Sequence, residues 1–300
     1  MYAIVGATGN TGKIIAQALL DHGQKVRVIG RDANRLNDFA RKGAEPFTAD
    51  ATDPDALTKA FAGAKAVYVM IPPNPSALDV AAYQEQVSSA TAAAIEKAGV
   101  EYAVLLSSVG ADKESGTGPV VGLHNFEKKL NAINRLNVLC LRAGYFMENL
   151  LPQVQVIKAF GMMGGPLHPN RGVPMIATQD IGASAAEALL KLSFKGKQTR
   201  ELLGQRDVTY NEAASLIGKA IGKPDLAYAE LPASQLKPAL VQSGMSDSMV
   251  DLLLEMSQAI NSGHMVALES RSAGNTTPTS IEQFVDKVFA PMYSGKAAGA

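Results

Sequence analysis

Short apolar blocks alternate with longer amphipathic stretches through the first half of the chain. Strand-sized blocks lie at residues 2–5, 26–29, 43–49, 66–71, 102–106 and 138–141. Between them apolar residues recur at helical spacing, as at Val80, Val87 and Ala94. Strands that alternate with helices are typical of a parallel, doubly wound sheet with right-handed crossovers. The pattern therefore predicts an α/β protein whose ligands bind at the carboxyl ends of the strands.

The pattern changes after Phe146. Nine of the eleven methionines lie from Met147 onward, and residues 161–174 are rich in glycine and proline. Amphipathic helices are predicted at 209–222 and 245–260. Because methionine fills irregular apolar spaces, we expect a smaller C-terminal substrate lobe over the strand ends. The expected division is a first domain at 1–146 that also takes in about 175–196, a lobe formed mainly by 147–292, and a flexible tail at 293–300.

A glycine-rich turn follows the first strand and opens the first helix. It reads Gly6-Ala7-Thr8-Gly9-Asn10-Thr11-Gly12. In a strand–turn–helix unit, Gly6 permits the tight turn, Gly9 lets the backbone approach a pyrophosphate, and Gly12 lets the helix pack on the strand. The free amides at the helix N-terminus then face the anion. This predicts a Rossmann-type dinucleotide site, with the cofactor bound by Gly6, Thr8, Gly9, Asn10, Thr11 and Gly12.

A cation follows the second strand. Arg31 lies 19 residues beyond Gly12, where an NAD-specific fold places an acidic residue on the ribose hydroxyls, and Arg35 lies one helical turn further on. Two arginines there favour the 2′-phosphate of NADPH (NADP⁺) over NADH. The alternative is that both are solvated surface residues. The remaining cofactor contacts expected at strand ends are Asp50, Ala51, Ile71, Pro72 and Ser107.

Composition narrows the class of protein. Lysine plus arginine number 28 and aspartate plus glutamate number 28, so the formal net charge is zero. This balance argues against a nucleic-acid binder, which needs excess cations to neutralise phosphates. The single cysteine, Cys140, cannot form an internal disulfide. No signal peptide or membrane-length apolar run is evident, and the histidines have no metal-ligand spacing. We expect a cytoplasmic protein without a membrane or metal partner.

Several motifs along the chain carry a family resemblance. They are Ile4–Gly9, Ile29–Asp32, Leu141–Asn149, Thr178–Gly182 and Thr277–Ser280. With these the chain resembles the short-chain dehydrogenase superfamily and, more narrowly, its atypical NmrA-like branch. That branch includes NADPH-dependent quinone reductases, triphenylmethane and azo dye reductases, and catalytically silent redox sensors. The resemblance implies an oxidoreductase that transfers hydride from NADPH to a flat apolar acceptor such as a quinone or dye.

One motif of the superfamily is missing. Its typical members use Tyr-x-x-x-Lys, in which the lysine lowers the pKa of the tyrosine for acid–base work. No tyrosine here has a lysine four residues later. The nearest match in spacing is His124 with Lys128, and a histidine can donate a proton near neutral pH. In quinone-reductase-like members a histidine lies 18 residues before the arginine that ends the next strand, as His124 lies before Arg142.

Substrate contacts are therefore expected from His124, a tentative proton donor, and from Tyr145, Phe146 and Asn149 after the sixth strand. The alternative interpretation is that His124 is a surface residue. The rings of Tyr145 and Phe146 suit stacking on a nicotinamide or a flat substrate, and packing in the core is the alternative. Loss of Tyr-x-x-x-Lys fits a second function equally well, a non-catalytic NADP(H)-binding redox sensor that acts through a protein partner. It disfavours an epimerase or dehydratase.

Overall fold

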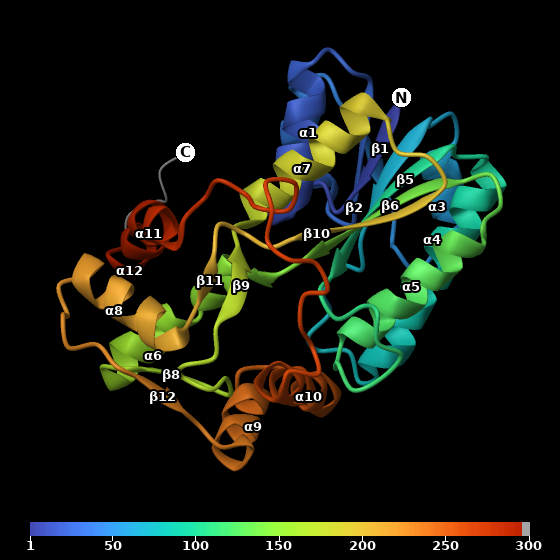
Figure 1. Cartoon of the computed structure of the whole chain (residues 1–300). Coiled ribbons are helices and arrows are strands. Elements are labelled where there is room, and N and C mark those ends of the chain that lie inside the picture. The colour runs from blue at the N-terminus through green and yellow to red at the C-terminus, as the bar shows by residue number, and fades with distance from the viewer. Residues whose placement is uncertain (296–300) are drawn as a thin grey trace.

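The computed structural model describes residues 1–295, and its centre is a seven-stranded parallel sheet (Figure 1). The strands lie in the order β10-β6-β5-β4-β1-β2-β3. Their bounds are β1 (Tyr2–Val5), β2 (Val26–Gly30), β3 (Glu45–Thr48), β4 (Ala66–Val69), β5 (Tyr102–Ser108), β6 (Asn137–Ala143) and β10 (Lys197–Leu202). All six predicted strands are confirmed.

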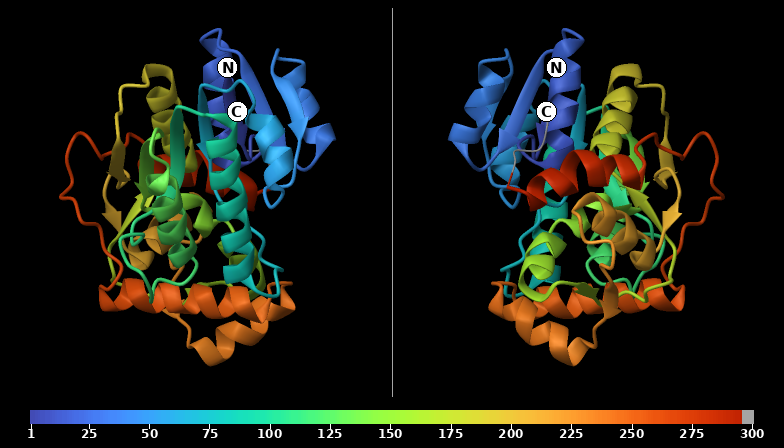
Figure 2. Two further views of the ribbon diagram at one scale, coloured as in Figure 1. Left: turned by 90° about the vertical axis from the view of Figure 1, so that its right-hand side faces the viewer. Right: turned by 90° about the vertical axis from the view of Figure 1, so that its left-hand side faces the viewer.

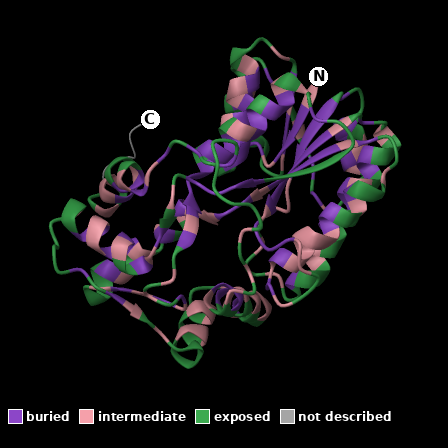
Figure 3. Cartoon of the chain, viewed as in Figure 1, coloured by how far each residue is buried: buried purple, intermediate pink, exposed green. Residues whose placement is uncertain are grey.

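The seventh strand, β10, was not predicted. It reads Lys-Gln-Thr-Arg-Glu-Leu, and its first four residues are exposed. It pairs with β6 at the sheet edge, where one side of the backbone and much of the side-chain surface face solvent. The inner strands are buried, whereas the edge strands β3 and β10 are largely exposed (Figure 3). A polar edge strand has no apolar run by which sequence patterning detects it.

Helices cover both faces of the sheet. On one face lie α1 (Asn10–Asp21), α2 (Ala33–Ala40) and α7 (Thr178–Lys191), and on the other lie α3 (Pro54–Phe61), α4 (Val80–Ala98) and α5 (Val120–Ala132). Successive strand residues point to opposite faces. In β1, Ile4 packs in the core under α1, while Ala3 and Val5 pack in the core under α3 and α4. This two-sided burial explains the nearly continuous apolar strands.

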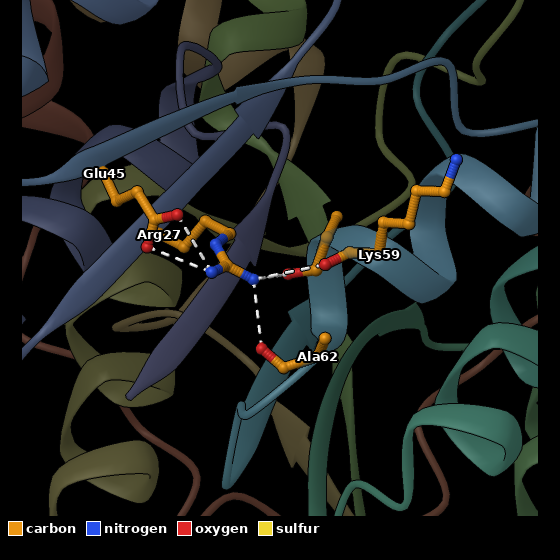
Figure 4. Close-up of polar contacts among 5 residues, drawn as sticks. Arg27, Glu45, Lys59 and Ala62 are labelled. Carbon is orange, nitrogen blue, oxygen red and sulfur yellow. Dashed lines mark hydrogen bonds and ion pairs between the residues drawn. The ribbon is translucent and has the colours of Figure 1, made fainter.

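The edge formed by β2 and β3 is tied to the end of α3 by Arg27 (Figure 4). One guanidinium nitrogen donates to the carbonyls of Lys59, Ala60 and Ala62 at 3.3, 2.7 and 3.1 Å. The other donates to both carboxylate oxygens of Glu45, at 2.9 and 3.0 Å. A cation at a helix C-terminus satisfies carbonyls that lack intrahelical partners. Arg27 thereby holds in place the strand that ends next to Arg31.

Most of the segment 145–293 builds a third apolar core, separate from the two that flank the sheet. It contains two small sheets, β11-β9-β7 and β12-β8. The strands are β7 (Tyr145–Phe146), β8 (Met163–Gly165), β9 (Val173–Ile176), β11 (Asp207–Val208) and β12 (Tyr228–Glu230). Its helical elements are a 3₁₀ turn (Met147–Leu150), α6 (Gln153–Phe160), α8 (Tyr210–Ala220), α9 (Ala233–Gln242), α10 (Asp247–Ser262), α11 (Ile281–Phe284), a π-helical turn (Val285–Phe289) and α12 (Ala290–Tyr293).

The two helices predicted in this region are α8 and α10. Both views in Figure 2 place α9 and α10 together at one end of the molecule. Segment 175–196, expected to return to the sheet, contains α7, which packs beside α1. Tyr293, expected to begin a tail, is the last residue of α12, and residues 296–300 of that tail lie outside the described residues. Within residues 1–295, no helix combines the length and apolarity needed to cross a bilayer.

Candidate functional site

A cavity of about 1060 Å³ lies at the carboxyl ends of the central strands. We call one part of it the turn side, lined by Gly6, Thr8, Gly9, Asn10, Thr11, Arg35, Ile71 and Ser107. The other part, the lobe side, is lined by Tyr145, Phe146, Asn149, Arg171–Pro174, Met256, Ile260 and several residues of a strap, defined here as residues 264–271. The sheet thus meets the C-terminal region at the edge where parallel α/β folds bind ligands.

The glycine-rich turn has the geometry expected of a phosphate loop. Gly6 adopts φ +68°, in the left-handed region, and the Gly9 amide donates to the Gly6 carbonyl at 2.9 Å. A Cβ on Gly12 would lie 2.2 Å from the Gly6 carbonyl oxygen, so only glycine permits this close approach of α1 to the turn. Gly9 is the N-cap of α1 and makes no side-chain cap, and the first turn of the helix carries no acidic residue. The amides of that turn are therefore left for an anion.

The predicted 2′-phosphate arginines occupy different positions. Arg35 lines the cavity and donates to the Thr8 carbonyl at 3.1 Å. Arg31 is exposed and does not line it, but its charge is close enough to help lower the pKa of Asp50, after the larger effect of a hydrogen bond from the Thr52 amide. Asp32 is occupied as the N-cap of α2, where it accepts from two backbone amides. The acid beside Arg31 is thus explained by helix capping.

Among the other predicted cofactor residues, some line the cavity and some do not. Ile71 and Ser107 line the cavity, whereas Gly12, Asp50, Ala51 and Pro72 do not. Gly12 acts through packing. The Pro72 carbonyl accepts a hydrogen bond from the Tyr83 hydroxyl at 3.0 Å. Burial raises the pKa of Tyr83, and the charges of Arg31 and Asp50 shift it in opposite directions. Arg31, Asp50 and Tyr83 therefore share one neighbourhood beside the turn side.

A buried network at the ends of β5 and β6 escaped the sequence analysis. The Ser107 hydroxyl donates to Glu127 Oε1 at 2.5 Å, and Arg142 donates to both Glu127 oxygens at 3.0 and 2.6 Å. Glu127 is only 5% exposed, and its carboxylate raises the pKa of Arg142. A charged residue on the buried face of α5, next to Phe126, was the available signal. The network fixes the orientation of the Ser107 side chain on the cavity wall.

His124 is placed less favourably than its spacing implied. Its Nδ1 lies 2.9 Å from the Ala111 carbonyl oxygen, so that nitrogen is the donor. Its Nε2 is buried and has no hydrogen-bond partner among the described residues. The neighbouring Leu123 and Val120 line the cavity, but His124 does not. A role for His124 as proton donor stays a prediction, and this geometry gives it no direct path to the cavity.

Tyr145, Phe146 and Asn149 all line the lobe side, and their role in substrate binding stays a prediction. The Tyr145 hydroxyl accepts a hydrogen bond from the Tyr210 hydroxyl at 2.9 Å, and burial raises the pKa of Tyr145. Tyr145 packs against the third core, whereas Phe146 packs against the core under α1 and α7. The two rings on β7 therefore connect the third core with the core under α1 and α7 at the cavity.

Apolar side chains that sequence analysis did not single out complete the lobe side. Met256 and Ile260 come from α10, Val173 and Pro174 from β9, and Met265, Val266 and Ala267 from the strap. The abundance of methionine after Phe146 was a general signal for such a wall, but it named no residue. Among the charged residues here, Arg271 pairs with Asp207 and donates to the carbonyls of Leu203 and Gly204 at 2.8 and 2.6 Å. The wall is mainly apolar, and the charge of Arg271 on it is paired with that of Asp207.

Comparison with known proteins supports the family resemblance that the sequence motifs carry. The family model described as NmrA-like matches residues 2–290. An NAD(P)H azoreductase of Xenophilus azovorans is 27% identical over 256 residues, which cover 85% of this chain and 86% of the relative.

Two solved structures are similar in fold. The NADPH-dependent quinone oxidoreductase QOR2 of Escherichia coli, complexed with NADPH, superposes with a TM-score of 0.80 at 24% identity, covering 96% of this chain and 100% of that one. The triphenylmethane reductase of Citrobacter sp., complexed with NADP(H), gives 0.79 at 20% identity, covering 95% and 99%. Since the family model spans nearly the whole chain, this protein belongs to the NmrA-like family.

Proposed function

We propose that the protein is an NADPH-dependent reductase that transfers hydride to a flat, apolar acceptor of the quinone or dye class. One observation carries the proposal: a single cavity joins an open helix N-terminus with a glycine turn to a wall of aromatic, aliphatic and methionine side chains. The names of the relatives, which are azo, quinone and triphenylmethane reductases, support the same reaction class.

The turn side fits a dinucleotide phosphate by its own chemistry. The amides of Asn10 and Thr11 begin a twelve-residue helix without a side-chain cap, and a Cβ at Gly12 would collide with the turn. Arg35, with Arg31 nearby, supplies positive charge for a 2′-phosphate, which supports NADPH over NADH. We further propose that residues 1–146 with 175–196 form the cofactor domain, and that 147–292 form mainly the acceptor lobe.

The reaction asks little of the side chains. Bound NADPH supplies the hydride, and the protein supplies position and a dry pocket. Residues Tyr145 and Phe146 hold a flat acceptor, while Met256 and Ile260 exclude water from it. A quinone that receives a hydride gains two electrons and becomes an anion, which then takes one proton from water. A quinone thus becomes a hydroquinone without a Tyr-x-x-x-Lys pair.

The test is NADPH consumption by the purified protein with quinones, azo dyes and triphenylmethane dyes, with NADH in parallel. We expect saturable turnover with NADPH and at least one acceptor. No consumption of any acceptor, despite NADPH binding, would overturn the reductase proposal.

That negative outcome would favour the second candidate, a redox sensor that binds NADP⁺ and NADPH unequally and acts through a protein partner. Two observations support this candidate: no tyrosine has a lysine four residues later, and His124 Nε2 has no access to the cavity. A sensor requires a large difference in affinity between NADPH and NADP⁺, which titration of each nucleotide measures directly.

A further inference from the structure

A buried carboxylate holds the strap against the end of the central sheet. Glu201 lies near the C-terminal end of β10 and is 2% exposed. Its Oε1 accepts from the Leu268 amide at 3.0 Å, and its Oε2 accepts from the Glu269 amide at 2.8 Å. Glu201 makes no ion pair with any of the described residues. A buried charge without a countercharge requires strong hydrogen bonds, and these two successive amides provide them.

The strap that these bonds hold is part of the cavity wall. Met265, Val266, Ala267 and Glu269 all line the lobe side. Residues 264–270 contain no helix or strand, so their amides have no regular backbone partners. Leu268 is 59% exposed and Val266 is 40% exposed, so burial of these side chains contributes little to holding the strap. In Figure 1 this segment runs from α10 past the end of β10 toward α11.

Among the described residues, the other hydrogen bonds of the strap lie toward its two ends. At its start, the Met265 amide donates to the Ala259 carbonyl at 3.0 Å. At its end, Asn275 donates to the Glu269 carboxylate and the Ser270 carbonyl at 3.2 and 3.0 Å, and Arg271 binds the carbonyls of Leu203 and Gly204. Glu201 is therefore the attachment of the backbone between these ends. We propose that Glu201 is a positioning residue for acceptor binding, which fixes the strap and so sets the shape of the lobe side. This inference rests on the proposed reductase function.

The chemistry of the attachment requires a carboxylate. Each oxygen of Glu201 faces one amide donor, and the carboxylate offers an acceptor at both positions. Glu201→Gln keeps the shape but turns an NH₂ group toward one of the amides, so one bond is lost and two donors face each other. The turn side is distant from this change, because three strands, β6, β5 and β4, separate β10 from β1. Loosening the strap is therefore expected to weaken acceptor binding and leave cofactor binding intact.

The chain offers a matched control in Asp180. Its carboxylate is also buried, at 6% exposure, and accepts from the Thr279 amide at 2.9 Å and the Thr279 hydroxyl at 2.7 Å. It likewise attaches a C-terminal segment, the one that contains Thr279, to helix α7. Neither Asp180 nor Thr279 lines the cavity. Asp180→Asn replaces a charged acceptor with a neutral one and so weakens this attachment without reshaping the lobe side.

The experiment compares wild type, Glu201→Gln and Asp180→Asn with menadione (2-methyl-1,4-naphthoquinone) as acceptor. It measures KM and kcat with NADPH, the NADPH dissociation constant, melting temperature, and equilibrium binding of menadione to the NADP⁺-loaded protein. We expect Glu201→Gln to raise both KM and the menadione dissociation constant about tenfold. We expect kcat and NADPH affinity to stay within about twofold, and Asp180→Asn to lower stability without changing KM.

A second variant tests the same attachment from the strap. Leu268→Pro removes one donor and leaves Glu201 in place, and it should raise the menadione constants in the same direction if Glu201→Gln folds poorly. The inference is overturned if menadione binding stays within twofold in both variants, or if Asp180→Asn weakens it equally. The binding measurement needs no turnover. If both strap variants weaken menadione binding but the protein reduces no acceptor, only the reductase proposal is refuted.

Discussion

The two sides of the cavity are built by different means. The turn side is made mostly by backbone from one short segment, Gly6–Gly12, held between β1 and α1. The lobe side is made by side chains from segments far apart in the chain, at 145–149, 171–174, 256–260 and the strap. A local backbone motif tolerates few substitutions and recurs in recognisable form, whereas a wall of apolar side chains accepts many combinations. Under the proposed function, the first would define the cofactor class and the second would define the acceptor.

The largest expected effect comes from breaking the turn side. Gly12→Val places a Cβ 2.2 Å from the Gly6 carbonyl oxygen, and the collision is with backbone that cannot move aside. We expect loss of NADPH binding and a stability loss of roughly 3 kcal/mol or more. Gly9→Val meets the same oxygen at 3.2 Å and should abolish binding with a smaller fall in melting temperature. Equal NADPH affinity in wild type and both variants, by fluorescence titration, would exclude the phosphate-loop interpretation.

The second-largest effect is expected on the difference in affinity between NADPH and NADH. Reversing the charge with Arg31→Glu and Arg35→Glu together should weaken NADPH binding by about 10- to 100-fold, the range of a lost charge-assisted contact. NADH binding should change little, because NADH lacks the 2′-phosphate. Arg41→Glu is the control, since Arg41 is exposed at the end of α2 and pairs with Asp38 away from the cavity. Equal losses for both nucleotides would show that these arginines do not read the phosphate.

A smaller effect is expected on the lobe side. Met256→Ala removes apolar contact from the cavity wall and should raise the KM for menadione roughly three- to tenfold, as expected for the loss of a few methylene-sized contacts. NADPH affinity should stay unchanged. Met249→Ala, on the same helix but not at the cavity, is the matched control. A loss of NADPH affinity in Met256→Ala would mean that the two sides are not separable.

The smallest effect is expected at His124. Because Nδ1 donates to Ala111 and Nε2 does not reach the cavity, His124→Asn should change kcat by less than about twofold and cost roughly 1 kcal/mol of stability at most. Steady-state kinetics and thermal unfolding test this. A tenfold fall in kcat with normal NADPH affinity would restore the proton-donor hypothesis drawn from the spacing of His124 and Arg142.

The sequence determined what depends on local backbone chemistry and on periodicity. Six parallel strands, the helices at 209–222 and 245–260, the glycine turn and the family could all be predicted, because each has its own signal in consecutive residues. Tyr145, Phe146 and Asn149 were placed at the site because they follow a strand end, where such sheets bind ligands.

Only the tertiary structure decided which distant side chains meet. It added the polar edge strand β10, the Ser107–Glu127–Arg142 network and the attachment of the strap to Glu201. It also turned His124 toward the Ala111 carbonyl and placed Gly12 under the turn. A buried carboxylate is stable only where donors from elsewhere in the chain converge on it. The residues that form it carry no pattern of their own, and the packing of the folded chain alone brings them together.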